Sequence, residues 1–230
     1  MNAPPRPLDA FDFTTTPTRA LSDADREAMR DLFDACYRQA NHAHMEKSLA
    51  RLRFVTFARR DGRPVAFGLA DAIVVDLPRL PATHVTLGGL CCVLPEARRE
   101  GLFGELMKRS MMAGDPPSPG ERWLAAGRVA HPAAFRTIGR GASAVPKPGL
   151  TPAPWQQEVG RAIAEVYGVE RFDPETFVCI GSGTTIGHPV IEQEVEPEEL
   201  ELFRRVDRSR GDQLLAITWS GSVPDGWLEK

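Results

Sequence analysis

The residues with the clearest chemical potential lie between Cys91 and Leu106, in the stretch CCVLPEARREGLFGEL. An apolar run leads into a basic turn that contains Gly101, and an amphipathic pattern typical of a helix follows. The first amides of a helix have no intrahelical acceptor and lie at the positive end of the helix dipole. A turn that leaves these amides open therefore predicts a binding site for an anion such as a phosphate.

The composition of this turn suits a pyrophosphate. Gly101 would let the ligand approach the backbone, and residues 98 to 104 would supply the amides. The side chains of Arg98 and Arg99 could add charge-assisted contacts. The alternative is an ordinary strand-to-helix connection whose arginines are solvated.

Catalytic groups are harder to identify from the sequence. His131 is the best candidate for a base or a substrate ligand, because imidazole titrates near neutral pH, although a histidine before a proline often only caps a turn. His84 is a weaker candidate. No histidine and acid can be paired with Cys91 and Cys92 from spacing, so these cysteines are expected to be buried and structural.

The glycine-rich stretch GSGTTIGHP, residues 181 to 189, invites comparison with a phosphate loop. It has no Lys-Ser/Thr pair of a Walker motif and precedes an expected strand rather than a helix. We therefore interpret it as a loop between strands.

The elements that would position these residues follow from hydrophobic periodicity and turn signals. Helices are expected at 23 to 40, 44 to 52, 102 to about 114, 156 to 167 and from 197 to about 207, with a short one after His131. Asp61-Gly62 predicts a hairpin, and further strands are expected at 84 to 94, 122 to 130, 176 to 180, 190 to 195 and 214 to 220. The strand 84 to 94 is apolar on both faces and so is expected to be central, with a bulge or a close ligand at Gly88-Gly89.

In this order of elements, the pattern Val93-x-Pro95-x-x-Arg98-x-x-Gly101-Leu102-x-x-x-Leu106 resembles the acetyl-CoA motif of the GNAT superfamily of acyl-CoA-dependent N-acetyltransferases. The resemblance covers the element order from Thr18 to Arg140. It implies an α+β fold, a mixed and mostly antiparallel central sheet flanked by helices, with a C-terminal extension. It also implies acetyl-CoA or another acyl-CoA as co-substrate, with no metal. The residues expected to bind it are Cys91, Val93, Arg98, Arg99, Glu100, Gly101, Leu102, Phe103 and Gly104, the two strand residues pairing with the pantetheine arm.

The chain departs from the pattern of this family at two positions. Phe103 stands where a second small residue is usual, and we expect its side chain to face the core and leave the amide free. Phe135 stands where many members have the tyrosine that serves as the acid. A free thiol has a pKa near 8.5, so a thiolate can leave without much help and activity need not be lost.

The composition limits the classes of partner that are expected for this chain. The chain has 230 residues, 42% of them hydrophobic, a net charge of −3 and a pI near 6.0, so a globular fold is expected and a nucleic-acid partner is not. Residues 1 to 17 are interpreted as a loosely held arm with a short strand near Phe11 to Thr15, and 18 to 230 as one domain whose part 150 to 230 lies on the substrate side. No signal peptide or membrane span is recognised, so a cytoplasmic location is expected, with a homodimer left open.

These observations favour a cytoplasmic acyltransferase that moves an acetyl or short acyl group from acyl-CoA to an amine by direct attack in a ternary complex. The amine would belong to a small molecule or a peptide. One alternative is a catalytically silent module that binds acyl-CoA or another small ligand on the same fold. Another is different acyl-CoA chemistry, such as decarboxylation or ester formation.

Overall fold

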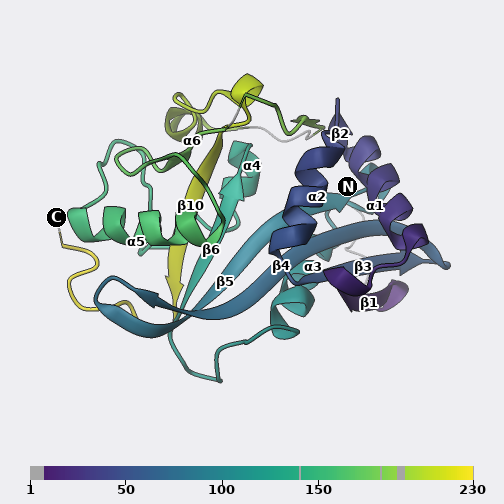
Figure 1. Cartoon of the computed structure of the whole chain (residues 1–230), viewed down its shortest axis with the longest axis horizontal. Coiled ribbons are helices and arrows are strands. Elements are labelled where there is room, and N and C mark those ends of the chain that lie inside the picture. Colours follow the sequence, from purple (N-terminus) through teal and green to yellow (C-terminus); the bar gives the residue numbers. More distant parts are fainter. Residues whose placement is uncertain (1–7, 140, 182, 191–194, 230) are drawn as a thin grey trace, which may run out of the picture. The chain divides into compact units, whose positions relative to one another are not determined.

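The computed structural model describes residues 8–139, 141–181, 183–190 and 195–229 (Figure 1). The chain forms two compact units. The first unit comprises Met1–Ala72, Gly88–Pro116 and Gly187–Val190, and the second unit comprises Ile73–Leu87, Pro117–Ile186 and Ile191–Lys230. Strands β4 (Arg63–Leu77) and β5 (Leu80–Val93) contribute residues to both units.

The first unit contains strands in the order β1-β3-β4-β5, with three helices packed on them. Besides its parts of β4 and β5, its elements are η1 (Leu8–Ala10), β1 (Asp12–Pro17), η2 (Thr18–Ala20), α1 (Asp23–Cys36), β2 (Tyr37–Arg38), α2 (His42–Arg51), β3 (Phe54–Arg60), η3 (Pro95–Ala97), α3 (Leu102–Met112) and β9 (His188–Pro189).

The predicted hairpin joins β3 to β4 through Asp61 and Gly62. Both residues have positive φ, 52° and 74°, which is the backbone that a two-residue hairpin turn requires and that an Asp-Gly pair supplies. The two strands then pair antiparallel from Arg60↔Arg63 to Phe54↔Ala70, with an irregularity between Ala58 and Arg59.

The two faces of the sheet in the first unit carry different helices. A Cβ atom placed on Gly68 would lie 3.0 Å from Cβ of Leu106 in α3, so this residue faces α3. Leu69, the next residue of β4, faces the other way because side chains alternate along a strand. The Leu69 side chain lies next to the position that a Cβ atom of Gly89 would take. The side chain of Leu52, the residue after α2, packs at the same position. Helix α3 therefore covers one face and the end of α2 the other.

Helix α1 begins as the sequence predicts and ends earlier. The Ser22 hydroxyl accepts the amide of Asp25, and the Asp25 carboxylate accepts the Ser22 amide in return, forming a capping box. The helix was expected to reach Ala40 but ends at Cys36. Tyr37 leaves the helix because it pairs with Pro189 in the small sheet of β2 and β9.

The second unit contains strands in the order β4-β5-β6-β10-β8-β7. Besides its parts of β4 and β5, its elements are β6 (Trp123–Val129), α4 (Pro132–Phe135), α5 (Pro154–Val166), β7 (Phe172–Asp173), β8 (Val178–Cys179), α6 (Pro197–Leu202), η4 (Arg208–Arg210) and β10 (Gln213–Ser220). Strands β6 and β10 pair antiparallel along seven residues each, from Leu214↔Val129 to Ser220↔Trp123.

Aromatic side chains build the core of the second unit. The Trp227 ring is completely buried and makes edge-to-face contacts with Trp155 and Trp219, with ring centroids 5.4 and 5.6 Å apart. The Trp227 indole N–H donates to the carbonyl of Ser143 at 2.9 Å, and Tyr167 donates its hydroxyl to the carbonyl of Ala126 at 3.0 Å. These two buried donors are therefore satisfied, whereas Nε1 of Trp219 is buried without a hydrogen-bond partner among the described residues.

The fold class predicted from the sequence is confirmed. The chain is α+β, with a mostly antiparallel sheet flanked by helices, and β5 lies between β4 and β6. The short strand expected in the N-terminal arm is present as β1, which pairs with β3 along its whole length, so the interpretation of residues 12 to 17 as loosely held is wrong. Residues 1 to 7 of the expected arm lie outside the described residues.

Other boundaries differ modestly from the predictions. The helix expected to reach Asp207 ends at Leu202, and the strand expected at 176 to 180 is confined to Val178–Cys179. The strand expected at 190 to 195 falls largely outside the described residues. Within the described ranges, no helix is both long and apolar enough to cross a bilayer.

Candidate acyl-CoA site and its supports

The turn between β5 and α3 has a backbone shaped by two residues with positive φ. The Leu94 amide donates to the carbonyl of Val65 at 3.0 Å, which ends the pairing of β5 with β4. One 3-10 turn follows, and then Arg99 and Gly101 adopt φ values of 65° and 84°. Gly101 takes this left-handed conformation without steric cost, whereas Arg99 takes it at some cost. The turn is therefore held in its shape by its surroundings.

The start of α3 presents open amides, as the sequence predicted. Gly101 is the N-cap residue and has no side chain to cap the helix, and the first amide with a backbone acceptor is that of Glu105, 3.4 Å from the Gly101 carbonyl. Within the described residues, no acceptor lies within hydrogen-bond distance of the amides of Leu102, Phe103 or Gly104. Such amides require a solvent or ligand acceptor.

The two glycines at the start of α3 have few described atoms near the positions that a Cβ atom would take. A Cβ atom added to Gly104 would have no described atom within 4 Å, and one added to Gly101 would meet only Cδ2 of Leu8, at 3.9 Å. Leu102 is 2% exposed and anchors the helix in the core. Phe103 is 39% exposed, so the expectation that its side chain faces the core is wrong: residue 102 takes the inward position, and its neighbour turns outward.

Arg98 supports the end of the strand. Its Nε donates to the carbonyl of Val93 at 3.1 Å, and the thiol of Cys36 donates to the same carbonyl at 3.3 Å. A carbonyl oxygen has two lone pairs, so these two donors occupy the Val93 acceptor that was expected to pair with pantetheine. Arg98 therefore supports the end of β5 through the Val93 carbonyl.

The cysteines of this region have the properties of structural thiols. Burial raises the pKa of Cys91 to about 12, and it raises that of Cys92 as well, so neither is a thiolate at neutral pH. The pKa of Cys36 is lowered, first by a hydrogen bond from Cys92 and then by the nearby Arg98. All four cysteines are free, as the sequence predicted.

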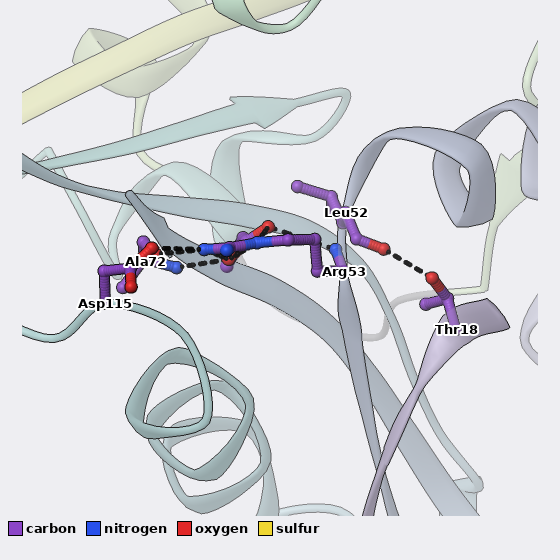
Figure 2. A network of polar contacts seen from close by, with 6 residues as sticks. Thr18, Leu52, Arg53, Ala72 and Asp115 are labelled. Carbon is purple, nitrogen blue, oxygen red and sulfur yellow. Dashed lines mark hydrogen bonds and ion pairs between the residues drawn. The ribbon is translucent and has the colours of Figure 1, made fainter. Parts of the chain in front are cut away.

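The far end of α3 is tied to the sheet by a polar network that the sequence analysis missed (Figure 2). The guanidinium of Arg53 binds the buried carboxylate of Asp71 through Nε and Nη2, with distances of 2.8 to 3.0 Å. Its Nη2 also contacts the carbonyl of Ala72 at 2.6 Å and the carboxylate of Asp115 at 2.9 Å, just after α3. The signal that could have revealed this network is Asp71 itself, a lone carboxylate in the apolar run of β4.

His131, the candidate base, lies in the second unit as the N-cap of α4. Its Nδ1 accepts the amide of Ala133 at 3.1 Å, which requires the nitrogen to be unprotonated. Burial lowers the pKa of His131, and the charges of Arg208 and Arg136 lower it further. The imidazole is therefore neutral at pH 7, with Nε2 as its remaining nitrogen. Its catalytic role stays a prediction.

Phe135, in the place of the expected tyrosine, belongs to the core of the second unit. It is 6% exposed and packs edge-to-face against Phe203, with ring centroids 6.4 Å apart. A Cβ atom on Gly139 would lie 2.0 Å from the Phe135 ring, so the chain closes tightly over it. This side chain contributes packing to the second unit.

The remaining candidates are held in structural contacts. His84 Nε2 lies 3.4 Å from a carboxylate oxygen of Glu121. In the stretch 181 to 189, His188 pairs with Arg38 across β2 and β9. Among the described residues, no group of three or more histidine, cysteine, aspartate or glutamate side chains could hold a metal ion.

No protein-family model matches the chain, and no curated protein does. Solved structures do match it. One is a protein of Deinococcus radiodurans R1 provisionally assigned as an acetyltransferase, with 18% identity and a TM-score of 0.38 over 67% of this chain and 95% of that one. Another is a ribosomal-protein-alanine N-acetyltransferase of Brucella melitensis biovar Abortus 2308, with 17% identity and a TM-score of 0.32 over 44% of this chain and 68% of that one.

An aminoglycoside N-acetyltransferase in complex with CoA also matches, with 21% identity and a TM-score of 0.31 over 45% of this chain and 69% of that one. These likenesses concern the fold, and no activity or site residue follows from them for this chain. The elements β1, α1, α2, β3, β4, β5, the basic turn, α3 and β6 occur along the chain in the order that the sequence resemblance implies, with the short strand β2 between α1 and α2.

Proposed function

We propose that the chain binds an acyl-CoA at the start of α3 and transfers its acetyl or short acyl group to an amine. The observation that carries this proposal is the set of amides at Leu102, Phe103 and Gly104, which have no acceptor among the described residues. A Cβ atom at Gly101 or Gly104 would meet no described side chain closer than 3.9 Å. The positive end of the helix dipole favours a pyrophosphate there.

The residues of the turn would have different roles in binding acyl-CoA. Gly101 and Gly104 leave room for the phosphates, and the three open amides would donate to them. Arg98 and Cys36 fix the strand end through the Val93 carbonyl, and the backbone of Cys91 remains on the strand that would pair with pantetheine. In a ternary complex the amine nitrogen would attack the thioester carbon of acyl-CoA directly. The C–N bond of an amide forms, the C–S bond breaks, and CoA leaves as a thiolate that takes up the proton lost by the amine.

A charge placed in the turn tests this proposal. We expect Gly101→Asp to weaken the binding of acetyl-CoA at least about 100-fold, because a carboxylate would fill the open space and repel the phosphates. Isothermal titration calorimetry of the full chain with acetyl-CoA measures the effect.

Gly62→Asp is the matched control. Gly62 also has positive φ and open space around it, but it lies in the hairpin between β3 and β4. The control should bind acetyl-CoA as the unmodified chain does. Absence of binding by the unmodified chain at millimolar acetyl-CoA would overturn the proposal.

The second candidate function is a catalytically silent acyl-CoA-binding module. Phe135 favours it, because this position offers a buried ring and no hydroxyl acid. Release of free CoA thiol from acetyl-CoA, followed with a panel of small amines and peptides, separates the two. Binding without amine-dependent thiol release favours the module, and release with any amine favours the transferase.

A further inference from the structure

An ion pair links the turn to the neighbouring hairpin strand. Arg60 is the last residue of β3, and Glu100 lies in the turn between the two residues of positive φ, Arg99 and Gly101. Nη2 of Arg60 is 2.6 Å from Oε2 of Glu100, and the two side chains are only 18% and 12% exposed. A pair this close and this sheltered from solvent is screened much less than a surface pair.

The N-terminal segment supports this ion pair from the other side. The Arg60 guanidinium carbon lies 4.4 Å from the centre of the Phe11 ring, which is itself 6% exposed. The Phe11 amide donates to the carbonyl of Leu8 at 3.1 Å, closing the turn η1. Among the described residues, Leu8 in turn is the one whose side chain lies within 4 Å of the position that a Cβ atom of Gly101 would take. Residues 8 to 11 therefore pack beside the turn.

The position of Glu100 makes its charge important. A free carboxylate beside the amides of α3 would compete for them and repel a phosphate. Bound to Arg60, the same carboxylate is neutralised and held away as part of a fixed network. The ion pair thus acts both on the conformation of the turn and on the electrostatic potential at the phosphate site.

We propose that Arg60, seated on Phe11, is a positioning residue for acyl-CoA: it neutralises Glu100 and fixes the turn 99 to 101, and the N-terminal segment 8 to 11 is a structural part of the binding site. This inference rests on the proposed acyl-CoA binding at α3. Neither Arg60 nor Phe11 needs to touch the ligand.

The test compares acetyl-CoA affinity in variants of the full chain by calorimetry. We expect Arg60→Gln to weaken binding about tenfold, because Glu100 is left uncompensated in the turn. The charge-swapped double variant, Arg60→Glu with Glu100→Arg, restores an opposite-charge pair and should recover affinity to within about threefold of the unmodified chain. A role limited to folding would lower thermal stability without this recovery of affinity.

Arg59→Gln is the matched control. Arg59 is the neighbouring residue of β3 and pairs with Asp25 at 3.2 Å, away from the turn. This variant should lose a comparable ion pair and keep its affinity. Equal affinity of Arg60→Gln and the unmodified chain, or an equal loss in Arg59→Gln, overturns the inference while the proposed function stands. No binding by the unmodified chain overturns the proposed function first. If Arg60→Gln does not fold, the charge-swapped double variant is the deciding measurement. The inference is then overturned if the double variant binds acetyl-CoA more than about tenfold more weakly than the unmodified chain.

Discussion

At the scale of single residues, the second unit holds the most informative titratable group. His131 caps α4 through an unprotonated Nδ1, and its pKa is lowered by burial and by two arginines. The unfolded chain therefore binds a proton at His131 more readily than the folded chain does. Folding stability due to this residue is present above the ordinary pKa of about 6.5 and is lost as the pH falls through it.

Replacing His131 with asparagine separates capping from titration. The asparagine carbonyl can accept the Ala133 amide, but it does not titrate. We expect the free energy of unfolding of the unmodified chain, relative to His131→Asn, to fall as the pH is lowered from 7.5 to about 5.5. Urea unfolding at a series of pH values measures it, and a difference that does not change with pH would contradict the assigned cap.

Residue types predicted the backbone of the turn before α3 better than they predicted the contacts of the side chains around it. Gly101 and the open amides of α3 were predictable because positive φ and helix termini have local sequence signals. The role of Arg98 was not, since its bond to the Val93 carbonyl depends on how the strand ends. The outward position of Phe103 follows from which of two adjacent apolar residues the core accepts, and tertiary packing decides this.

At the scale of elements, α3 is fixed at both ends. Its start is connected through Glu100 to Arg60 on β3, and the residue Asp115 after its end is connected through Arg53 to Asp71 on β4. Along its length it packs against the sheet, where the Ser110 hydroxyl donates to the carbonyl of Gly68 at 3.0 Å. An anion site formed by this helix would therefore be preorganised.

Two glycines at opposite ends of α3 give opposite predictions. A Cβ atom on Gly114 would lie 2.6 Å from the Ala72 carbonyl oxygen and 2.9 Å from Oδ1 of Asp71, so Gly114→Ala should destabilise the chain by about 2 kcal/mol. Gly104 lies in the helix with nothing within 4 Å, so Gly104→Ala should stabilise it by about 0.5 kcal/mol. Chemical denaturation measures both, and equal effects of the two substitutions would contradict these contacts.

The elements themselves were largely predictable, because most of them have clear patterns. The hairpin at Asp61-Gly62 and the helix that starts at Asp23 carry strong turn and capping signals and are found where expected. The end of α1 was missed because Tyr37 pairs with Pro189, a partner 152 residues away that no local pattern reveals. The strand β1 is short and lies at the edge of the sheet, and it forms a strand through its pairing with β3.

At the scale of the whole molecule, the two compact units share strands, and the tryptophans are confined to one of them. Residues of β4 and β5 belong to both units, so unfolding of one unit breaks strands of the other. All four tryptophans lie in the second unit, whereas the proposed phosphate site lies in the first. Tryptophan fluorescence therefore reports on the unit that does not contain the proposed phosphate site.

We expect unfolding to be one cooperative transition. Acetyl-CoA at about 100 times its dissociation constant stabilises the bound unit by about 2.7 kcal/mol, which corresponds to a rise in Tm of roughly 5 to 10 °C for a chain of this size. The same rise should be seen by tryptophan fluorescence and by far-UV circular dichroism. A rise in the dichroism alone would show that the units unfold independently, and Gly101→Asp should show no rise with either probe.

The close packing of Leu52 against Gly89 has a consequence for how this chain can vary through evolution. A Cβ atom on Gly89 would lie 2.2 Å from Cδ1 of Leu52 and 3.0 Å from the carbonyl oxygen of Leu69. The Leu52 side chain therefore fills the space that a side chain at position 89 would need. Positions 52 and 89 should therefore covary among homologues: a side chain at 89 requires a smaller residue at 52, and a large residue at 52 restricts 89 to glycine.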